Sequence, residues 1–109
     1  MARGGQVSQS STFVDSDANG TPEKAIDGNR ASVWSQNSCA HTLKQTNPWW
    51  RVDLRKTYKV NYVKITNRKD CCSERINGAE IRIGNSLNDN GNGNPRYCTT
   101  LACFAQIHR

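Results

Sequence analysis

Short runs of alternating apolar and polar residues form the main pattern along this chain. They lie at residues 50–54, 63–66 and 79–83, where tryptophan, valine, leucine, isoleucine or alanine alternates with charged residues or threonine. An alternation with a period of two puts successive side chains on opposite faces, so each run predicts a half-buried β-strand. A weaker strand is expected over residues 6–13, and a short helical turn over residues 22–26.

Long polar loops separate these runs, at residues 15–23, 27–46 and 85–95. They are rich in Asn, Asp, Ser and Gly, which favour turns. The chain has no internal repeat and no helix-length amphipathic pattern. Several short strands separated by turn residues predict an all-β sandwich or barrel. Long loops on such a rigid scaffold are a common location for binding sites.

Length and composition limit the chain to one domain with a modest core. It has 109 residues, of which 35% are hydrophobic, so disulfides or a metal are expected to supplement the core. Five cysteines favour an oxidising compartment, and their odd number leaves at least one without an intrachain partner. They are Cys39, Cys71, Cys72, Cys98 and Cys103. A zinc site is disfavoured, because there is no C-x-x-C pair and no histidine at ligand spacing.

The net charge of +6 raises the question of an anionic partner. The positive residues are dispersed, and the densest run, residues 51–59, is interpreted as the solvated side of a strand and the turn after it. No nucleic-acid partner is expected, because no binding motif accompanies the charge. No membrane insertion is expected either, because no apolar run is long enough to span a bilayer. The first five residues are not a secretory signal peptide, so the chain is either secreted with a signal that is not present here or not secreted.

The most informative motif consists of one histidine and two arginines. His41 is followed, after a long gap, by the pattern Arg-x-Asp-x-x-x-x-Arg, which begins at Arg68 and ends at Arg75. Two guanidinium groups and an imidazole can direct several N–H groups at the oxygens of one sugar ring, and an ionised Asp70 can orient Arg68. Taken singly, a histidine or a strand arginine is more often a structural or surface residue, so the hypothesis depends on the spacing.

This motif closely resembles the sugar-binding motif of the F-type lectins, or fucolectins. The resemblance extends over about residues 9–95 and includes further segments in family order. These segments are residues 25–29, 38–41, 47–54, 65–68 and 74–81. It implies an all-β sandwich of jelly-roll type, discoidin-like and galactose-binding-like, with long loops. We expect a lectin-like domain over residues 1–95 and an unmatched tail over residues 96–109, and thus an incomplete sandwich, truncated or divergent at the C-terminus.

The resemblance also assigns roles to the motif. It implies that His41, Arg68 and Arg75 contact terminal α-L-fucose, while Asp70 orients an arginine. It further implies an apolar wall made by a disulfide between Cys71 and Cys72. Adjacent Cα atoms lie only about 3.8 Å apart, below the usual disulfide range of about 4.4–6.8 Å, so this bond is expected from the resemblance alone. Trp34, in the loop before the histidine, is the candidate for contact with the fucose methyl group.

A calcium site is the expected cofactor site. Asp27, Asn29 and Ser38 supply hard oxygens in a glycine-containing loop, which suits calcium but equally suits an ordinary Asx-rich turn. The resemblance implies a structural calcium at these three residues and at the carbonyl of Lys24. The family's C-terminal Cys-Glu pair is not found here, so calcium binding is expected to be weakened or lost. The pairing of Cys39, whose family partner is that cysteine, stays open between the two cysteines of the tail.

We therefore expect a secreted lectin that binds terminal α-L-fucose on glycans without chemistry, with a calcium-assisted fold. A glycosidase is disfavoured, because Asp70 and Glu74 lie on a loop beside arginines and would ionise and pair with them. The expected partners are fucosylated glycans, with a homo-oligomer left open. The alternatives are a discoidin-like module that binds another glycan, a lipid or a protein, and a truncated chain that binds nothing.

Overall fold

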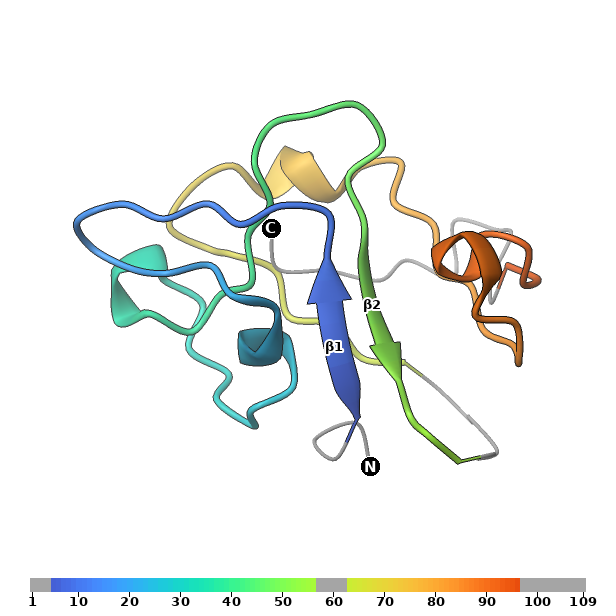
Figure 1. Cartoon of the computed structure of the whole chain (residues 1–109). Helices are drawn as coiled ribbons and strands as arrows, with labels where there is room; N and C mark the ends of the chain where they lie inside the picture. The colour runs from blue at the N-terminus through green and yellow to red at the C-terminus, as the bar shows by residue number, and fades with distance from the viewer. Residues whose placement is uncertain (1–4, 57–62, 97–109) are drawn as a thin grey trace.

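One antiparallel strand pair organises the part of the chain that is described, residues 5–56 and 63–96 of this computed structural model. β1 (Gln6–Gln9) pairs with β2 (Trp50–Asp53), in a register that runs from Gln6 opposite Asp53 to Gln9 opposite Trp50. Figure 1 shows the two strands side by side, with the loops arranged around them. The strand expected at residues 50–54 is confirmed, and the weaker N-terminal strand is shorter than expected.

The described helices are single turns of 3-10 helix. They are η2 (Pro22–Ala25), η3 (Trp34–Gln36), η4 (Ser73–Ile76) and η5 (Asn88–Gly91). A proline in the first turn starts η2, where its missing N–H is no loss, so the helical turn expected at residues 22–26 is confirmed. Among the described residues, no helix has the length and apolar character needed to cross a membrane.

Two of the expected strands are corrected by the structure. Residues 63–66 form no strand, and residues 79–83 contribute only an isolated bridge between Arg82 and Arg96. Beside that bridge, the N–H of Ile83 donates to the carbonyl of Pro95 at 3.1 Å. A strand requires a ladder of backbone hydrogen bonds with a neighbour, and alternation of side chains does not provide that neighbour.

The small core lies where the long loops meet. Ala18, Trp34 and Cys39 are buried together, and Phe13 packs against them. Backbone hydrogen bonds tie these loops to one another: Phe13 N–H donates to the carbonyl of His41 at 2.8 Å, and Gly20 N–H donates to the carbonyl of Phe13 at 2.9 Å. The core therefore forms the floor beneath the loop that contains His41.

An open hollow of about 2400 Å³ extends from the sheet to residues 77–94. Its wall contains apolar side chains from β2 and from the later extended segments, among them Val52, Leu54, Ile65, Ile81 and Ile83. Ile81 and Ile83 are only half-buried. The alternating segments that were expected to be strands thus line the hollow and do not enclose it.

Candidate functional site

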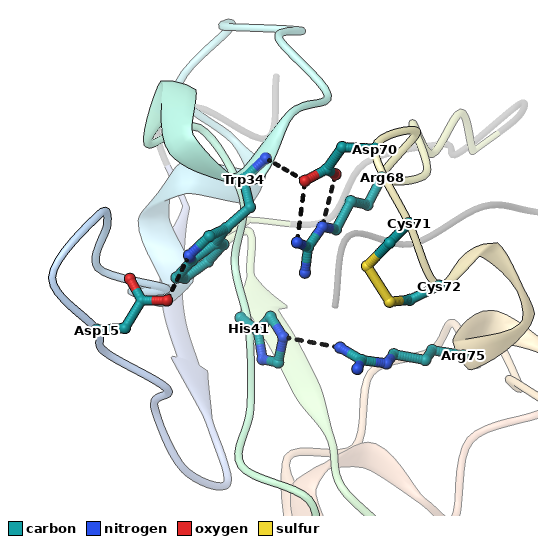
Figure 2. A network of polar contacts seen from close by, with 8 residues as sticks. All are labelled: Asp15, Trp34, His41, Arg68, Asp70, Cys71, Cys72 and Arg75. Carbon is teal, nitrogen blue, oxygen red and sulfur yellow. Dashed lines mark hydrogen bonds and ion pairs between the residues drawn. A yellow bond between two sulfur atoms is a disulfide. The ribbon is translucent and has the colours of Figure 1, made fainter.

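The structure brings His41, Arg68 and Arg75 together, and we call these three residues the clamp. His41 lies in the loop between η3 and β2, Arg68 in the segment before η4, and Arg75 within η4. Nη1 of Arg75 lies 3.4 Å from Nε2 of His41. Figure 2 shows the ring of His41 and the two guanidinium groups facing a common space.

Asp70 holds the guanidinium group of Arg68 through two hydrogen bonds. Nε of Arg68 donates to Oδ1 of Asp70 at 2.6 Å, and Nη2 donates to Oδ2 at 3.0 Å. This two-pronged contact lowers the pKa of Asp70 to about 2, against the opposing effect of burial. Asp70 is therefore ionised at any physiological pH, and both its oxygens are committed to orienting Arg68.

The ring of His41 is fixed in one tautomer. Its Nδ1 lies 2.6 Å from the carbonyl oxygen of Thr42, which can only accept, so Nδ1 carries the hydrogen. Nε2 consequently presents a lone pair to Arg75. Burial lowers the pKa of His41 below its ordinary 6.5; the hydrogen bond to Thr42 opposes this, and the charge of Arg75 adds to it. The imidazole is therefore a neutral hydrogen-bond acceptor at neutral pH.

The main chain of His41 is held as closely as its ring. Its N–H donates to the carbonyl of Gly20 at 2.9 Å, and Nε2 of Gln9 donates to that same carbonyl at 2.7 Å. A Cβ atom on Gly20 would lie 2.5 Å from the Cβ atom of His41, so only glycine fits there. The sequence did not point to Gln9 or Gly20, because no sequence signal indicates that either residue lies beside the distant loop of His41.

Cys71 and Cys72 form a disulfide, as the resemblance implies. Cys72 has a left-handed backbone with φ of 65° and precedes η4. Its carbonyl accepts from the N–H of Arg75 at 3.0 Å, which closes the turn that presents Arg75. In Figure 2 the two sulfur atoms lie between the side chains of Arg68 and Arg75. The disulfide is thus an apolar surface beside the two guanidinium groups.

Trp34 forms the inner wall of this region. It begins η3 and is 5% exposed, with its ring centroid 5.6 Å from that of Phe13 and 5.2 Å from that of His41. The guanidinium carbon of Arg68 lies 5.7 Å from the indole centroid. The indole Nε1–H donates to Oδ2 of Asp15 at 2.9 Å. Sequence reasoning selected Trp34 but not Asp15, since nothing in the sequence links positions so far apart.

Among the residues expected to hold calcium, hydrogen bonds link Asp27, Asn29 and Ser38 to one another. The hydroxyl of Ser38, a residue only 1% exposed, donates to the carbonyl of Asn29 at 2.9 Å. Oδ1 of Asp27 accepts from the N–H of Asn29 at 2.8 Å, which is an Asx turn. The Nζ of Lys24 is a cation and donates to the carbonyl of Asn19. The backbone carbonyl oxygen is therefore the group through which Lys24 could bind a metal. These donors are hard oxygens of the kind calcium prefers, with Asp27 as their one carboxylate.

Other expectations stay predictions. Within the described residues, no group of three His, Cys, Asp or Glu side chains is placed to hold a metal ion. Cys39 is fully buried, and burial raises the pKa of its thiol. Cys98, Cys103 and the rest of the tail after residue 96 lie outside the described residues. The pairing of Cys39 and the domain boundary at residue 95 are therefore untested.

Comparison with known proteins finds fucolectins among the relatives of this chain. It is 61% identical over 74 residues to fucolectin-1 of Anguilla japonica, a match that covers 68% of this chain and 42% of that protein. It is 52% identical over 88 residues to a fucolectin of Anguilla anguilla, covering 81% of this chain and 55% of that protein. The chain thus spans about half the length of these relatives.

A solved structure and a family model agree with this. A fucolectin from the serum of striped bass, Morone saxatilis, superposes with a TM-score of 0.85 at 49% identity, covering 99% of this chain and 36% of that one. This match confirms the expected all-β, galactose-binding-like fold class. The model of the NedA-like, galactose-binding domain matches residues 24–102. The chain therefore belongs to the family of the NedA-like, galactose-binding domain and is related to the fucolectins.

Proposed function

We propose that this chain binds terminal α-L-fucose on glycans through the clamp. The observation that supports this is the convergence of two guanidinium groups and one neutral imidazole on a common space, beside an apolar disulfide. Several of the relatives are named fucolectins, which points to the same ligand. We also propose an extracellular location, since one relative comes from serum.

The clamp combines donors with one acceptor, which suits the vicinal hydroxyls of a sugar. Arg68 and Arg75 donate N–H groups to hydroxyl or ring oxygens. Nε2 of His41 accepts from a hydroxyl that replaces its 3.4 Å contact with Arg75, because the ring nitrogen has a single lone pair. The disulfide provides an apolar face for the C–H side of the ring, and the buried Trp34 supports Arg68 and His41 from the core side. A single monosaccharide buries few atoms, so we expect weak affinity per site and biological strength through multivalency.

We propose binding without chemistry. A glycosidase needs a carboxylic acid that holds a proton at working pH, opposite a second carboxylate. The pKa of Asp70 is lowered to about 2, and both its oxygens are used by Arg68. Asp70 therefore lacks the proton that a general acid must donate.

Removing either arginine of the clamp tests the proposal. We expect Arg68→Ala and Arg75→Ala to abolish detectable fucose binding, because each charge-assisted hydrogen bond is worth roughly 1.5–3 kcal/mol. Arg75→Lys should retain part of the affinity, since a point charge keeps part of the contact. Isothermal titration with L-fucose measures this. Arg30→Ala is the matched control, as Arg30 is exposed and outside the clamp. Unchanged affinity in a folded Arg68→Ala protein would refute the assignment.

A glycan array with and without calcium separates the alternatives. Binding restricted to fucosylated glycans supports the proposed ligand. Binding to other glycans, or to lipid or protein surfaces in parallel assays, favours a discoidin-like module of different specificity. If the folded chain binds no glycan, lipid or protein, the proposal that the clamp binds fucose is wrong.

We further propose that the loop of Asp27, Asn29 and Ser38 holds a structural calcium, aided by the carbonyl of Lys24. The supporting observation is that hydrogen bonds link Asp27, Asn29 and Ser38, and that Ser38 is buried. Calcium bound there would cross-link the two ends of the loop. A rise in melting temperature on adding calcium, absent in Asp27→Asn, is the expected result. No shift in the unaltered chain would reject the site.

A further inference from the structure

Trp34 is held between two carboxylates that come from different loops. Oδ2 of Asp15 accepts the indole Nε1–H at 2.9 Å, and Oδ2 of Asp70 lies 3.4 Å from the backbone N–H of the same residue. Figure 2 shows Asp15 against the nitrogen edge of the indole, on the side away from Arg68. Asp70 already belongs to the clamp through Arg68, whereas Asp15 has had no assigned role.

Asp15 is itself fixed in position. Its Oδ1 accepts from the backbone N–H of Asp17 at 2.9 Å and from that of Ala18 at 3.0 Å. One carboxylate oxygen therefore shapes the loop, and the other is left for the indole. Burial acts to raise the pKa of Asp15, but the hydrogen bonds from Asp17, Trp34 and Ala18 outweigh it, so the pKa is lowered and the group stays ionised.

The orientation of the Trp34 indole determines which part of its ring contacts His41 and Arg68. The terminal torsion of a tryptophan side chain has broad, roughly two-fold minima, so packing alone leaves room for a flipped ring. A buried indole N–H normally finds a partner, and a flip here would separate it from Asp15. The indole contacts the ring of His41 and lies under the Arg68 guanidinium, so a flipped ring would change both contacts.

We propose that Asp15 is a positioning residue of the sugar site, which holds the indole of Trp34 in the orientation that supports His41 and Arg68. This inference rests on the proposed function. It extends the site to a residue that does not face the common space of the clamp. Asp15 acts through Trp34, and its contribution disappears when the indole N–H is removed.

Asp15→Asn is the informative variant, because it changes one oxygen and keeps the shape. The amide oxygen can still accept from Asp17 and Ala18, but the amide NH₂ then faces the indole N–H, donor against donor. Asp17→Asn is the matched control, since Asp17 is an exposed carboxylate in the same loop. Trp34→Phe removes the indole N–H, and the double variant Asp15→Asn with Trp34→Phe completes a double-mutant cycle.

Two measurements are made on each variant: titration with methyl α-L-fucoside, and the chemical shift and hydrogen exchange of the Trp34 indole N–H by NMR. We expect Asp15→Asn to weaken fucoside binding about tenfold, because only about a tenth of the chains would then hold the indole in the orientation that supports the clamp. The indole signal should shift and exchange faster. Asp17→Asn should change neither, and Asp15→Asn should have no further effect on affinity in the Trp34→Phe background.

An unaltered indole signal in Asp15→Asn would overturn the inference. A shifted signal with unaltered fucoside affinity would overturn it too, because the hydrogen bond between Asp15 and Trp34 would then have only a structural role. Additive losses in the cycle would overturn it as well, by showing that Asp15 acts apart from Trp34. If the unaltered chain binds no fucoside, the proposed function fails and the positioning role in sugar binding fails with it. The NMR comparison then still decides whether Asp15 orients Trp34.

Discussion

At the scale of single residues, His41 depends on neighbours that have no part in the motif. Gly20 leaves space for its main chain, Thr42 selects its tautomer, and Phe13 stacks on its ring at 4.8 Å. The motif led us to expect His41, Arg68 and Arg75 in one site, and the structure has the three side chains facing a common space; their contact with sugar stays a prediction.

The acceptor role of His41 predicts acid-sensitive binding. The pKa of His41 is lowered in the folded protein, so the neutral form persists to below pH 6.5 and binding should be constant above that value. As the pH falls through the folded pKa, Nε2 gains a proton and stops accepting, and affinity should fall by up to about tenfold per pH unit. Stability follows the same sign: it is fully present above 6.5 and declines as the pH falls towards the folded value. Titrations between pH 5 and 8 measure this, and His41→Gln should remove the dependence.

Gly20 predicts a steric effect on the site. In Gly20→Ala the new Cβ would lie 2.5 Å from Cβ of His41 and 2.9 Å from its N and O, so the loop must move. Such overpacking costs roughly 1–3 kcal/mol, and fucose affinity should fall as well. Chemical denaturation and titration measure the two effects. Gly93→Ala is the control, because a Cβ atom added there would have no neighbouring atom within 4 Å; equal behaviour of the two variants would contradict the packing described here.

At the scale of elements, the disulfide and η4 act as one unit. The Cα atoms of Cys71 and Cys72 are 3.7 Å apart, closer than the usual disulfide range of about 4.4–6.8 Å. The left-handed Cys72 then leads into the turn that contains Arg75. Reduction would therefore free both the apolar wall and the start of η4.

Mild reductant is accordingly expected to lower fucose affinity before it unfolds the domain. Cys71 is exposed, and an exposed disulfide is more easily reduced. The double variant Cys71→Ser with Cys72→Ser should bind weakly and should not respond to reductant. Affinity and circular dichroism are followed along one reductant series. Loss of fold and affinity at the same concentration would show that the disulfide supports the whole domain rather than the site.

Elements were predictable where a local pattern determines them. The alternation at residues 50–54 and the proline at the start of η2 suffice for β2 and the first helical turn. Residues 63–66 and 79–83 have the same alternation but no ladder partner within the described residues. Asp15 and Gln9 were missed for a related reason, because their partners lie in distant loops and only the folded chain brings them together.

At the scale of the whole molecule, some apolar residues are packed in the interior and others lie on the wall of the open hollow. Ile76 is 3% exposed and packed, whereas Ile81 is half-buried on the wall of the hollow. We expect Ile76→Ala to lower the free energy of unfolding by roughly 2–5 kcal/mol. Ile81→Ala should cost less than about 1 kcal/mol, since it already contacts solvent.

Urea denaturation of the two variants measures this difference, with sedimentation velocity to report the oligomeric state. Similar costs for Ile76→Ala and Ile81→Ala would mean that protein covers the hollow in solution. A dimer that Ile81→Asp converts to a monomer would assign the covering to a second copy.

The strand pairing described above also governs how the molecule assembles. Gln9 pairs with Trp50, so β1 and β2 close a loop that contains residues 10–49, including Asp15, Trp34 and His41. Closing a flexible loop of this length costs about 3 kcal/mol of chain entropy before its contacts repay it. Contacts between residues so far apart slow folding, because the transition state must bear that entropy first. We therefore expect the floor of the clamp to form together with the sheet, because the pairing of β1 with β2 closes the loop that contains Asp15, Trp34 and His41.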